Sequence, residues 1–146
     1  MIEIEDHLSK DICNYLIHCY KQNKDKTSTY NNRKIININD LKNDVVIKKL
    51  IENYSKYYPN HYLKNMELIY WPKDEYHDWH DDTIYYDKTT ITYLNDDYEG
   101  GKTKVENYEV DPKTGKIILF DSDKKHKVSP LLKGERYVIL AWYKHG

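Results

Sequence analysis

The chain has 146 residues with a formal net charge of −1, and 39% of its residues are hydrophobic. A near-neutral chain gives no electrostatic reason to expect nucleic acid or an anionic membrane as a partner, and no apolar run approaches the roughly 20 residues that cross a bilayer. This length suits one domain with one core. We expect a single domain over 1–146, with a helical part over about 1–60 and a strand-rich part over about 61–146.

The N-terminus and the cysteines predict a cytoplasmic protein. The first residues are acidic and lack the basic and apolar regions of a signal peptide. On one helix, Cys13 and Cys19 would be separated by about 9 Å of rise, beyond the roughly 7 Å Cα limit for a disulfide. We expect both to be small core residues in a reducing compartment. The sequence carries no signal for an oligomeric state.

The first part of the chain carries two helical patterns. Ser9 is a suitable N-cap, and the apolar residues that follow recur at helical spacing. The polar stretch 21–33 is expected to form a loop that leads to a short strand over 34–38. Asp40 is expected to cap the second helix. Both apolar stripes are ordinary core faces, so we assign them packing and no chemistry.

After about residue 61 the pattern changes to strands. Residues 62–71 alternate, and 89–95 are β-branched and aromatic. Shorter strands are expected between turn-forming segments, over 102–107, 117–120 and 136–143. Two helices followed by many short strands predict an α+β domain built on a β-barrel or jelly roll.

The densest group of titratable side chains lies at 76–82, where two His and three Asp flank one Trp. Residues two apart on a strand point the same way, so His80 and Asp82 would aim an imidazole and a carboxylate at one point. A second imidazole would complete the two-His, one-carboxylate set that holds non-haem Fe(II) and leaves positions open. His126 is the best candidate. A surface loop without a metal is the plainer interpretation of the same pair.

Arg136 opens a predicted strand that is apolar on both faces. Such a strand is central and buried, and a buried guanidinium needs an anionic partner. The partner could be an internal Asp or Glu, or the carboxylate of a ligand held by the planar guanidinium fork. An Fe(II) site together with a carboxylate-binding Arg is the minimum equipment for 2-oxoglutarate, which would chelate the metal at one end and meet the Arg at the other.

From about residue 70 to 143 the chain resembles the 2-oxoglutarate- and Fe(II)-dependent dioxygenases of the prolyl 4-hydroxylase type, most closely their small free-standing bacterial and phage members. Several motifs occur in the order typical of that family: WHDD at 79–82, TYLN at 92–95, YEGGKT at 98–103, DPKTG at 111–115 with Phe120, HKVSP at 126–130, and KGERY at 133–137 with Trp142. The ordered set is far more specific than any one motif. It implies a double-stranded β-helix, a cupin-like jelly roll, with the N-terminal helices packed on its outside.

The resemblance also implies roles for individual residues. His80, Asp82 and His126 would be the iron ligands, and Arg136 would complete the catalytic set by binding the distal carboxylate of 2-oxoglutarate. A second group, Tyr93 and Tyr70, would bind the co-substrate together with Arg136.

In that second group, Tyr93 would place its hydroxyl on the same distal carboxylate, and Tyr70 would contact the metal-binding end of the co-substrate. Enzymes of this type couple the oxidative decarboxylation of 2-oxoglutarate to hydroxylation of an unactivated C–H bond, with ascorbate as a candidate reductant. Peptidyl proline, in a protein or peptide partner, is the substrate that the resemblance implies.

Two departures from the family pattern concern the substrate. Asp74 stands where the family often has Gly, and Lys88 is the only basic residue in a segment where related prolyl hydroxylases often carry Arg. An oxygenase acting on another side chain, a free amino acid or a nucleobase is therefore the first alternative. A non-enzymatic jelly-roll metal-binding module is the second, and it would need neither Arg136 nor Tyr93.

Overall fold

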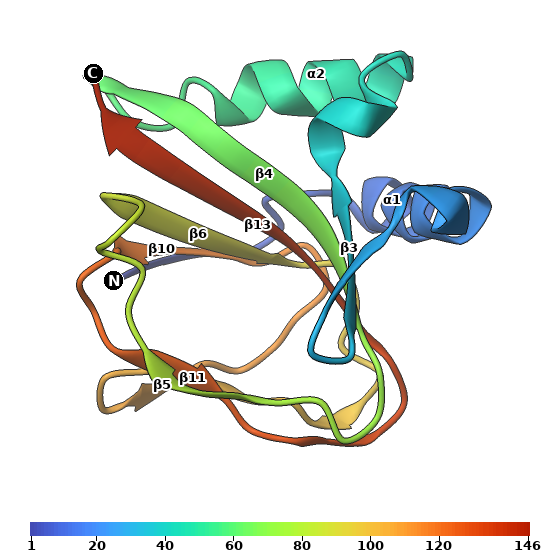
Figure 1. Ribbon diagram of the computed structural model, residues 1–146, viewed down its shortest axis with the longest axis vertical. Coiled ribbons are helices and arrows are strands. Elements are labelled where there is room, and N and C mark those ends of the chain that lie inside the picture. Colours follow the sequence, from blue (N-terminus) through green and yellow to red (C-terminus); the bar gives the residue numbers. More distant parts are fainter.

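A computed structural model describes residues 1–146. Two β-sheets face each other, and two helices cover the outer side of the larger sheet (Figure 1). The larger sheet is antiparallel and has seven strands in the order β1 (Ile2–Ile4), β10 (Ile117–Asp121), β6 (Lys88–Tyr93), β13 (Arg136–His145), β4 (His61–Trp71), β3 (Arg33–Asn37) and β2 (Ser28–Tyr30).

The smaller sheet lies across from it. Its four strands have the order β5 (His77–His80), β11 (His126–Val128), β8 (Thr103–Val105) and β9 (Tyr108–Glu109), and a separate pair joins β12 (Leu131–Lys133) to β7 (Glu99–Gly100). Figure 1 shows both helices on the side of the larger sheet that faces away from β5 and β11. This arrangement confirms the predicted α+β jelly roll with its helices outside.

The first helix begins where its sequence predicted. α1 (Lys10–Gln22) is capped by Ser9, whose Oγ accepts the backbone N–H of Ile12 at 3.2 Å. The stretch expected to be a loop over 21–33 contains the last residues of α1, a 3-10 turn η1 (Lys24–Lys26) and the edge strand β2. Neither α1 nor the second helix has the length and apolar character of a membrane span.

The second helix begins later than predicted. α2 (Val45–Tyr54) is capped by Asp44, whose Oδ1 accepts two backbone N–H groups of the first turn at 2.8 and 3.1 Å. Asp40 lies in a separate 3-10 helix η2 (Ile38–Leu41), so the expectation that it caps this helix is wrong. Both residues have the right side chain, and only Asp44 stands directly before the continuous helical turns.

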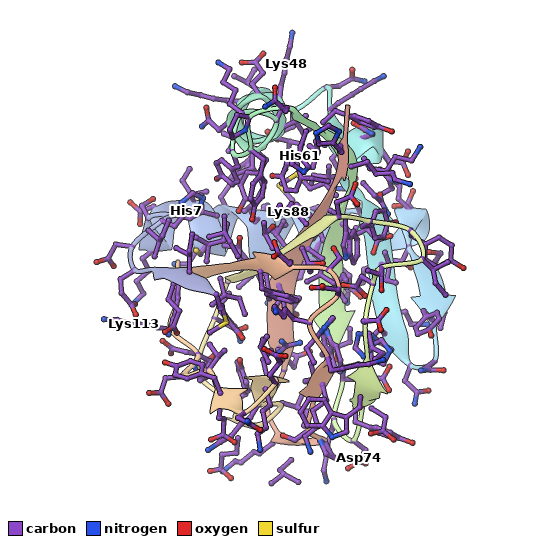
Figure 2. All side chains as sticks on the ribbon, turned by 90° about the vertical axis from the view of Figure 1, so that its left-hand side faces the viewer. His7, Lys48, His61, Asp74, Lys88 and Lys113 are labelled. Atoms are coloured by element: carbon purple, nitrogen blue, oxygen red, sulfur yellow. The ribbon has the colours of Figure 1, made fainter.

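The larger sheet is buried on both faces because its central strands alternate between two cores. One core of 18 buried residues lies against the helices and includes Met66 and Leu68 of β4. The other, of 10 buried residues, fills the space between the sheets and includes Ile69 and Trp71. Charged side chains such as Lys48 point away from the body of the protein (Figure 2). Every second residue of β4 and β13 therefore faces the space between the sheets, where the site lies.

Candidate active site

Three potential metal ligands meet at one end of the smaller sheet. β5 ends at His80, and the antiparallel register places His126 of β11 directly opposite. Asp82 follows two residues later, and its backbone N–H donates to the carbonyl of Ser122 at 2.9 Å. One ligand atom from each of the three side chains lies within 4.8 Å of the others. The structure thus brings together the three residues that the sequence singled out.

The backbone determines which nitrogen of each imidazole faces the shared point. Nδ1 of His80 lies 2.6 Å from the carbonyl oxygen of Asp78, and Nδ1 of His126 lies 2.9 Å from that of Lys124. A ring nitrogen that faces a carbonyl carries the proton, so each Nε2 keeps a free lone pair. These Nε2 atoms lie 3.8 and 3.5 Å from the carboxylate oxygens of Asp82. Burial lowers the pKa of His126, which favours the neutral form that ligates a metal.

Two donors orient the Asp82 carboxylate. Its Oδ2 accepts the hydroxyl of Thr89 at 2.9 Å and the indole N–H of Trp142 at 3.3 Å. Both donors belong to strands of the larger sheet, so these bonds tie the ligand across the space between the sheets. Hydrogen bonds behind a ligand fix its orientation for the metal. Two imidazoles and one carboxylate on one side form the set that suits Fe(II) and leaves other positions open.

A further imidazole supports His80 from behind. The ring of His77 stacks on it, with centroids 3.5 Å apart and planes at 12°. Nη1 of Arg33 lies 3.1 Å from Nδ1 of His77, and Nε of Arg33 pairs with Glu75 at 3.0 Å. Burial, followed by the charges of His80 and Arg33, lowers the pKa of His77 to about 3. Its ring is therefore neutral and accepts the hydrogen bond from Arg33, which holds it against the ligand.

A cavity of about 320 Å³ lies between the sheets and extends from the three potential ligands to Arg136. This volume falls in the range of small-molecule sites. Most of its wall is apolar and comes from the larger sheet, including Ile35, Ile69, Ile91, Val138 and Leu140. One small ligand could therefore meet the three potential ligands at one end and a guanidinium at the other.

The guanidinium of Arg136 is buried without a carboxylate. The residue is only 1% exposed, and its one hydrogen bond runs from Nη2 to Oγ1 of Thr103 at 3.2 Å. Nε and Nη1 have no partner, and no Asp or Glu lies within ion-pair distance. The internal salt bridge that the sequence left open is not formed. A buried cation with free donors is costly unless a ligand supplies the anion.

Other donors gather around this guanidinium. The Trp71 ring lies under it, with the centroid 4.7 Å from Cζ, and the indole N–H of Trp71 is buried without a partner. The buried Tyr98 hydroxyl also lacks a partner. The Tyr93 hydroxyl donates to Thr103 Oγ1 at 2.7 Å, so it shares that acceptor with Arg136. This group of donors fits a carboxylate, which has up to four acceptor sites.

Gly101 lets the backbone approach Arg136. A Cβ at this position would lie 3.2 Å from Cδ of Arg136 and 3.4 Å from the Tyr98 ring, and its φ of +57° is the left-handed conformation that glycine adopts without strain. The glycine pair of the sequence motif thus leaves room for the buried guanidinium.

The comparison with known families agrees with this geometry. The model of the 2OG-Fe(II) oxygenase superfamily matches residues 66–144, more than half of the chain. The chain belongs to the 2OG-Fe(II) oxygenase superfamily. It is therefore a dioxygenase, and the family implies Fe(II) and 2-oxoglutarate. No curated protein matches the sequence.

Solved structures share the fold of this oxygenase. A Pseudomonas putida prolyl-4-hydroxylase aligns with a TM-score of 0.75 and 16% identity over 99% of this chain and 92% of its own. A viral collagen prolyl hydroxylase from Paramecium Bursaria Chlorella virus-1 aligns with a TM-score of 0.71 and 15% identity, over 99% of this chain and 95% of its own. A Trichoplax adhaerens prolyl hydroxylase aligns with a TM-score of 0.69 and 19% identity, over 99% of this chain and 83% of its own. That structure is a complex with a hypoxia inducible factor oxygen degradation domain peptide fragment. These identities establish a common fold.

One expected site residue of the oxygenase lies elsewhere. Tyr70 faces the helices, where its ring stacks on Tyr20 at 5.3 Å and lies 5.4 Å from the ring of Tyr137. Its neighbours Ile69 and Trp71 face the cavity instead. The expected contact of Tyr70 with the co-substrate does not fit this position, because successive residues of a strand point to opposite faces.

The sequence did not single out Trp71, Tyr98 or Thr103 as partners of Arg136. The last two lie within the motif at 98–103, so a signal was present. Trp71 carried none, because its role depends on which face of β4 it occupies.

Metal binding by the oxygenase should depend on all three ligands. We expect His80→Ala, Asp82→Ala and His126→Ala each to weaken Mn(II) binding at least about 100-fold, above the 10–100-fold loss typical of a residue behind a ligand. Anaerobic calorimetry with Mn(II) measures this, and His18→Ala, an exposed His on α1, is the matched control. A folded His126→Ala protein with wild-type affinity would show that His126 is not a ligand.

His77 should support Mn(II) binding because its ring stacks on His80. His77→Ala should weaken Mn(II) binding about 10- to 100-fold, because His80 loses the surface that holds it. His77→Phe keeps a stacked ring and should recover most of the affinity. If both variants lose the same amount, the hydrogen bond to Arg33 carries the effect and stacking does not.

Proposed function

We propose that this chain is an Fe(II)- and 2-oxoglutarate-dependent dioxygenase that hydroxylates an unactivated C–H bond in a peptide or protein, with peptidyl proline as the leading target. One observation carries the proposal. The cavity that holds the His80, Asp82, His126 set ends at Arg136, whose buried Nε and Nη1 have no partner in the protein. A metal-binding module without a co-substrate has no use for such an arginine.

In this proposal the two ends of the cavity have separate tasks. His80, Asp82 and His126 would hold Fe(II), and their two-imidazole, one-carboxylate set suits a metal that keeps other positions open. Arg136 binds the distal carboxylate of 2-oxoglutarate. Tyr93 lies beside Arg136, because both residues donate to Oγ1 of Thr103. When bound, the metal and 2-oxoglutarate supply the oxidising chemistry, in which 2-oxoglutarate and O₂ give succinate and CO₂ as the C–H bond is hydroxylated.

The remaining residues control the environment of that chemistry. The apolar walls exclude water from the reacting centre, which strengthens the ion pair at Arg136. Thr89 and Trp142 keep the Asp82 carboxylate in its ligating orientation. Ascorbate remains a candidate reductant.

Similar solved structures support peptidyl proline as the substrate. Three similar structures are prolyl hydroxylases, and one of them holds a peptide fragment. The residues that line the cavity include the half-buried or exposed rings of Tyr30, Tyr85, Tyr86 and Trp142, which could pack against an extended peptide.

Arg136→Ala tests the co-substrate assignment. Removing one partner of a buried charge pair costs about 2–5 kcal/mol, so 2-oxoglutarate affinity should fall at least about 30-fold while Mn(II) binding survives. Arg136→Lys keeps the charge without the fork and should fall between wild type and Ala. Anaerobic calorimetry with Mn(II) measures both ligands, and Lys113→Ala, an exposed cation, is the control. A folded Arg136→Ala protein that binds 2-oxoglutarate like wild type would refute the assignment.

Substrate class is tested by turnover. If peptidyl proline is the target, proline peptides should raise succinate formation above the rate without substrate, and mass spectrometry should place one added oxygen atom on the proline ring. Matched peptides with alanine in place of proline should not respond. Turnover on free amino acids or nucleosides, with none across a broad set of proline peptides, would move the assignment to those substrates.

A further inference from the structure

A carboxylate that the proposed chemistry does not use also lines the cavity. Glu67 lies on β4 opposite Leu140 of β13. It shares its face of the strand with Ile69 and Trp71, which also line the cavity. The residue is half-buried, so its charge is partly removed from water. An acidic group in a mostly apolar cavity requires an explanation, because an unpaired buried charge is destabilising.

The protein gives this carboxylate little compensation. Oε2 of Glu67 accepts one hydrogen bond, from Nδ2 of Asn65 at 3.2 Å, and no Lys, Arg or His lies within ion-pair distance. Burial raises the pKa of Glu67, opposed by the Asn65 hydrogen bond and by the more distant charge of Arg33. Arg33 is itself engaged with Glu75 at 3.0 Å.

With a metal and 2-oxoglutarate bound, the charges in and around the cavity would balance without Glu67. A divalent metal together with Arg136 and Arg33 would balance Asp82, the two carboxylates of 2-oxoglutarate and Glu75. The imidazoles add no charge, because a His that ligates a metal is neutral and Nδ1 of His77 faces the donor Nη1 of Arg33. Glu67 is then the one carboxylate of the cavity without a positive counterpart.

Glu67 also lies away from the part of the cavity assigned to 2-oxoglutarate. In the register of β4 and β13, Trp71 pairs with Arg136, whereas Glu67 pairs with Leu140. At about 3.3 Å per residue, Glu67 is about 13 Å along the strand from Trp71. It therefore lies toward the end where Trp142 lines the cavity and donates to Asp82.

The surroundings of Glu67 suit the cation of a long side chain. Nδ2 of Asn65 lies 3.5 Å from the Tyr86 hydroxyl, so it links the carboxylate to an aromatic pair. In that pair the rings of Tyr86 and Trp142 stack with centroids 5.1 Å apart and planes at 17°. Aromatic faces attract ammonium and guanidinium groups, and apolar walls accommodate the methylene stems of Lys and Arg.

We propose that Glu67 is a specificity-determining residue that binds the ammonium or guanidinium group of a basic side chain in the substrate peptide. The inference rests on the proposed function and narrows its substrate class to peptides that carry Lys or Arg at or beside the hydroxylated residue. The carboxylate supplies the charge, and Tyr86 and Trp142 supply the aromatic wall.

Matched peptide pairs test this inference. Each pair differs only by Lys against norleucine or Arg against citrulline, in one set with proline and one without. With Fe(II) and 2-oxoglutarate, we expect the basic member to show kcat/KM at least about tenfold higher, the range of a hydrogen bond to a charged group. Succinate formation gives the rate, and mass spectrometry identifies the peptide that gains oxygen.

Two variants of Glu67 locate the preference. Glu67→Gln keeps the shape and loses the charge, so the basic and neutral peptides should become equivalent. Glu67→Lys should reverse the preference toward peptides with Glu in place of the basic residue. Glu52→Gln, an exposed carboxylate on α2, is the matched control and should keep the wild-type ratio.

Calorimetry with Mn(II) and 2-oxoglutarate separates the two proposals. A wild-type protein that fails to bind 2-oxoglutarate refutes the proposed function. A wild-type protein that binds it but turns over the members of each pair equally, or turns over no basic peptide, overturns the role of Glu67. The same conclusion follows if folded Glu67→Gln keeps the wild-type ratio.

Discussion

The buried guanidinium of Arg136 is the constraint on which the site depends. Burying an unpaired ion costs several kcal/mol even after the protein relaxes around it. The protein accepts this at the centre of its larger sheet, where β13 lies between β4 and β6. Trp71 packs under the guanidinium and Gly101 leaves room beside it, and neither residue neutralises the charge. A ligand that supplies the missing carboxylate therefore also stabilises the folded state.

The two sheets contribute different parts of the site. The smaller sheet provides His80 and His126, which the β5–β11 register places opposite each other. The larger sheet provides Arg136 and the donors to Asp82. Because Thr89 and Trp142 bind the carboxylate across the space between the sheets, the distance between the metal end and the guanidinium end is set by how the sheets pack. Mutations in the core between the sheets should therefore act on co-substrate and metal together.

Much of the site could be predicted from the sequence because its signals are local. His80 and Asp82 are two residues apart on extended chain, and the apolar strand around Arg136 indicates burial by itself. Tyr70 could not be placed, because a shift of one residue moves a side chain to the other face of a sheet and motif spacing does not resolve it. Asp44 and Asp40 are both good caps in a segment rich in Asn and Asp. The edge strands β1 and β2, of three residues each, depend on pairing with distant strands and left no periodic signal.

The cavity also explains why substrate identity is harder to predict than chemistry. The three proposed metal ligands, Arg136 and Tyr93 lie within sequence motifs, whereas Glu67, Asn65 and Tyr86 lie outside them. The charges of the metal and co-substrate site affect what the Glu67 site can bind. With a metal alone in the proposed site, Arg136 would lack a counter-charge and the cavity would carry net positive charge, which would disfavour a cationic side chain at Glu67. With the carboxylates of 2-oxoglutarate also in place, the net charge would be negative and Glu67 would attract that cation. If Glu67 binds a basic side chain, co-substrate and substrate should therefore bind with positive coupling, although their binding residues need not touch.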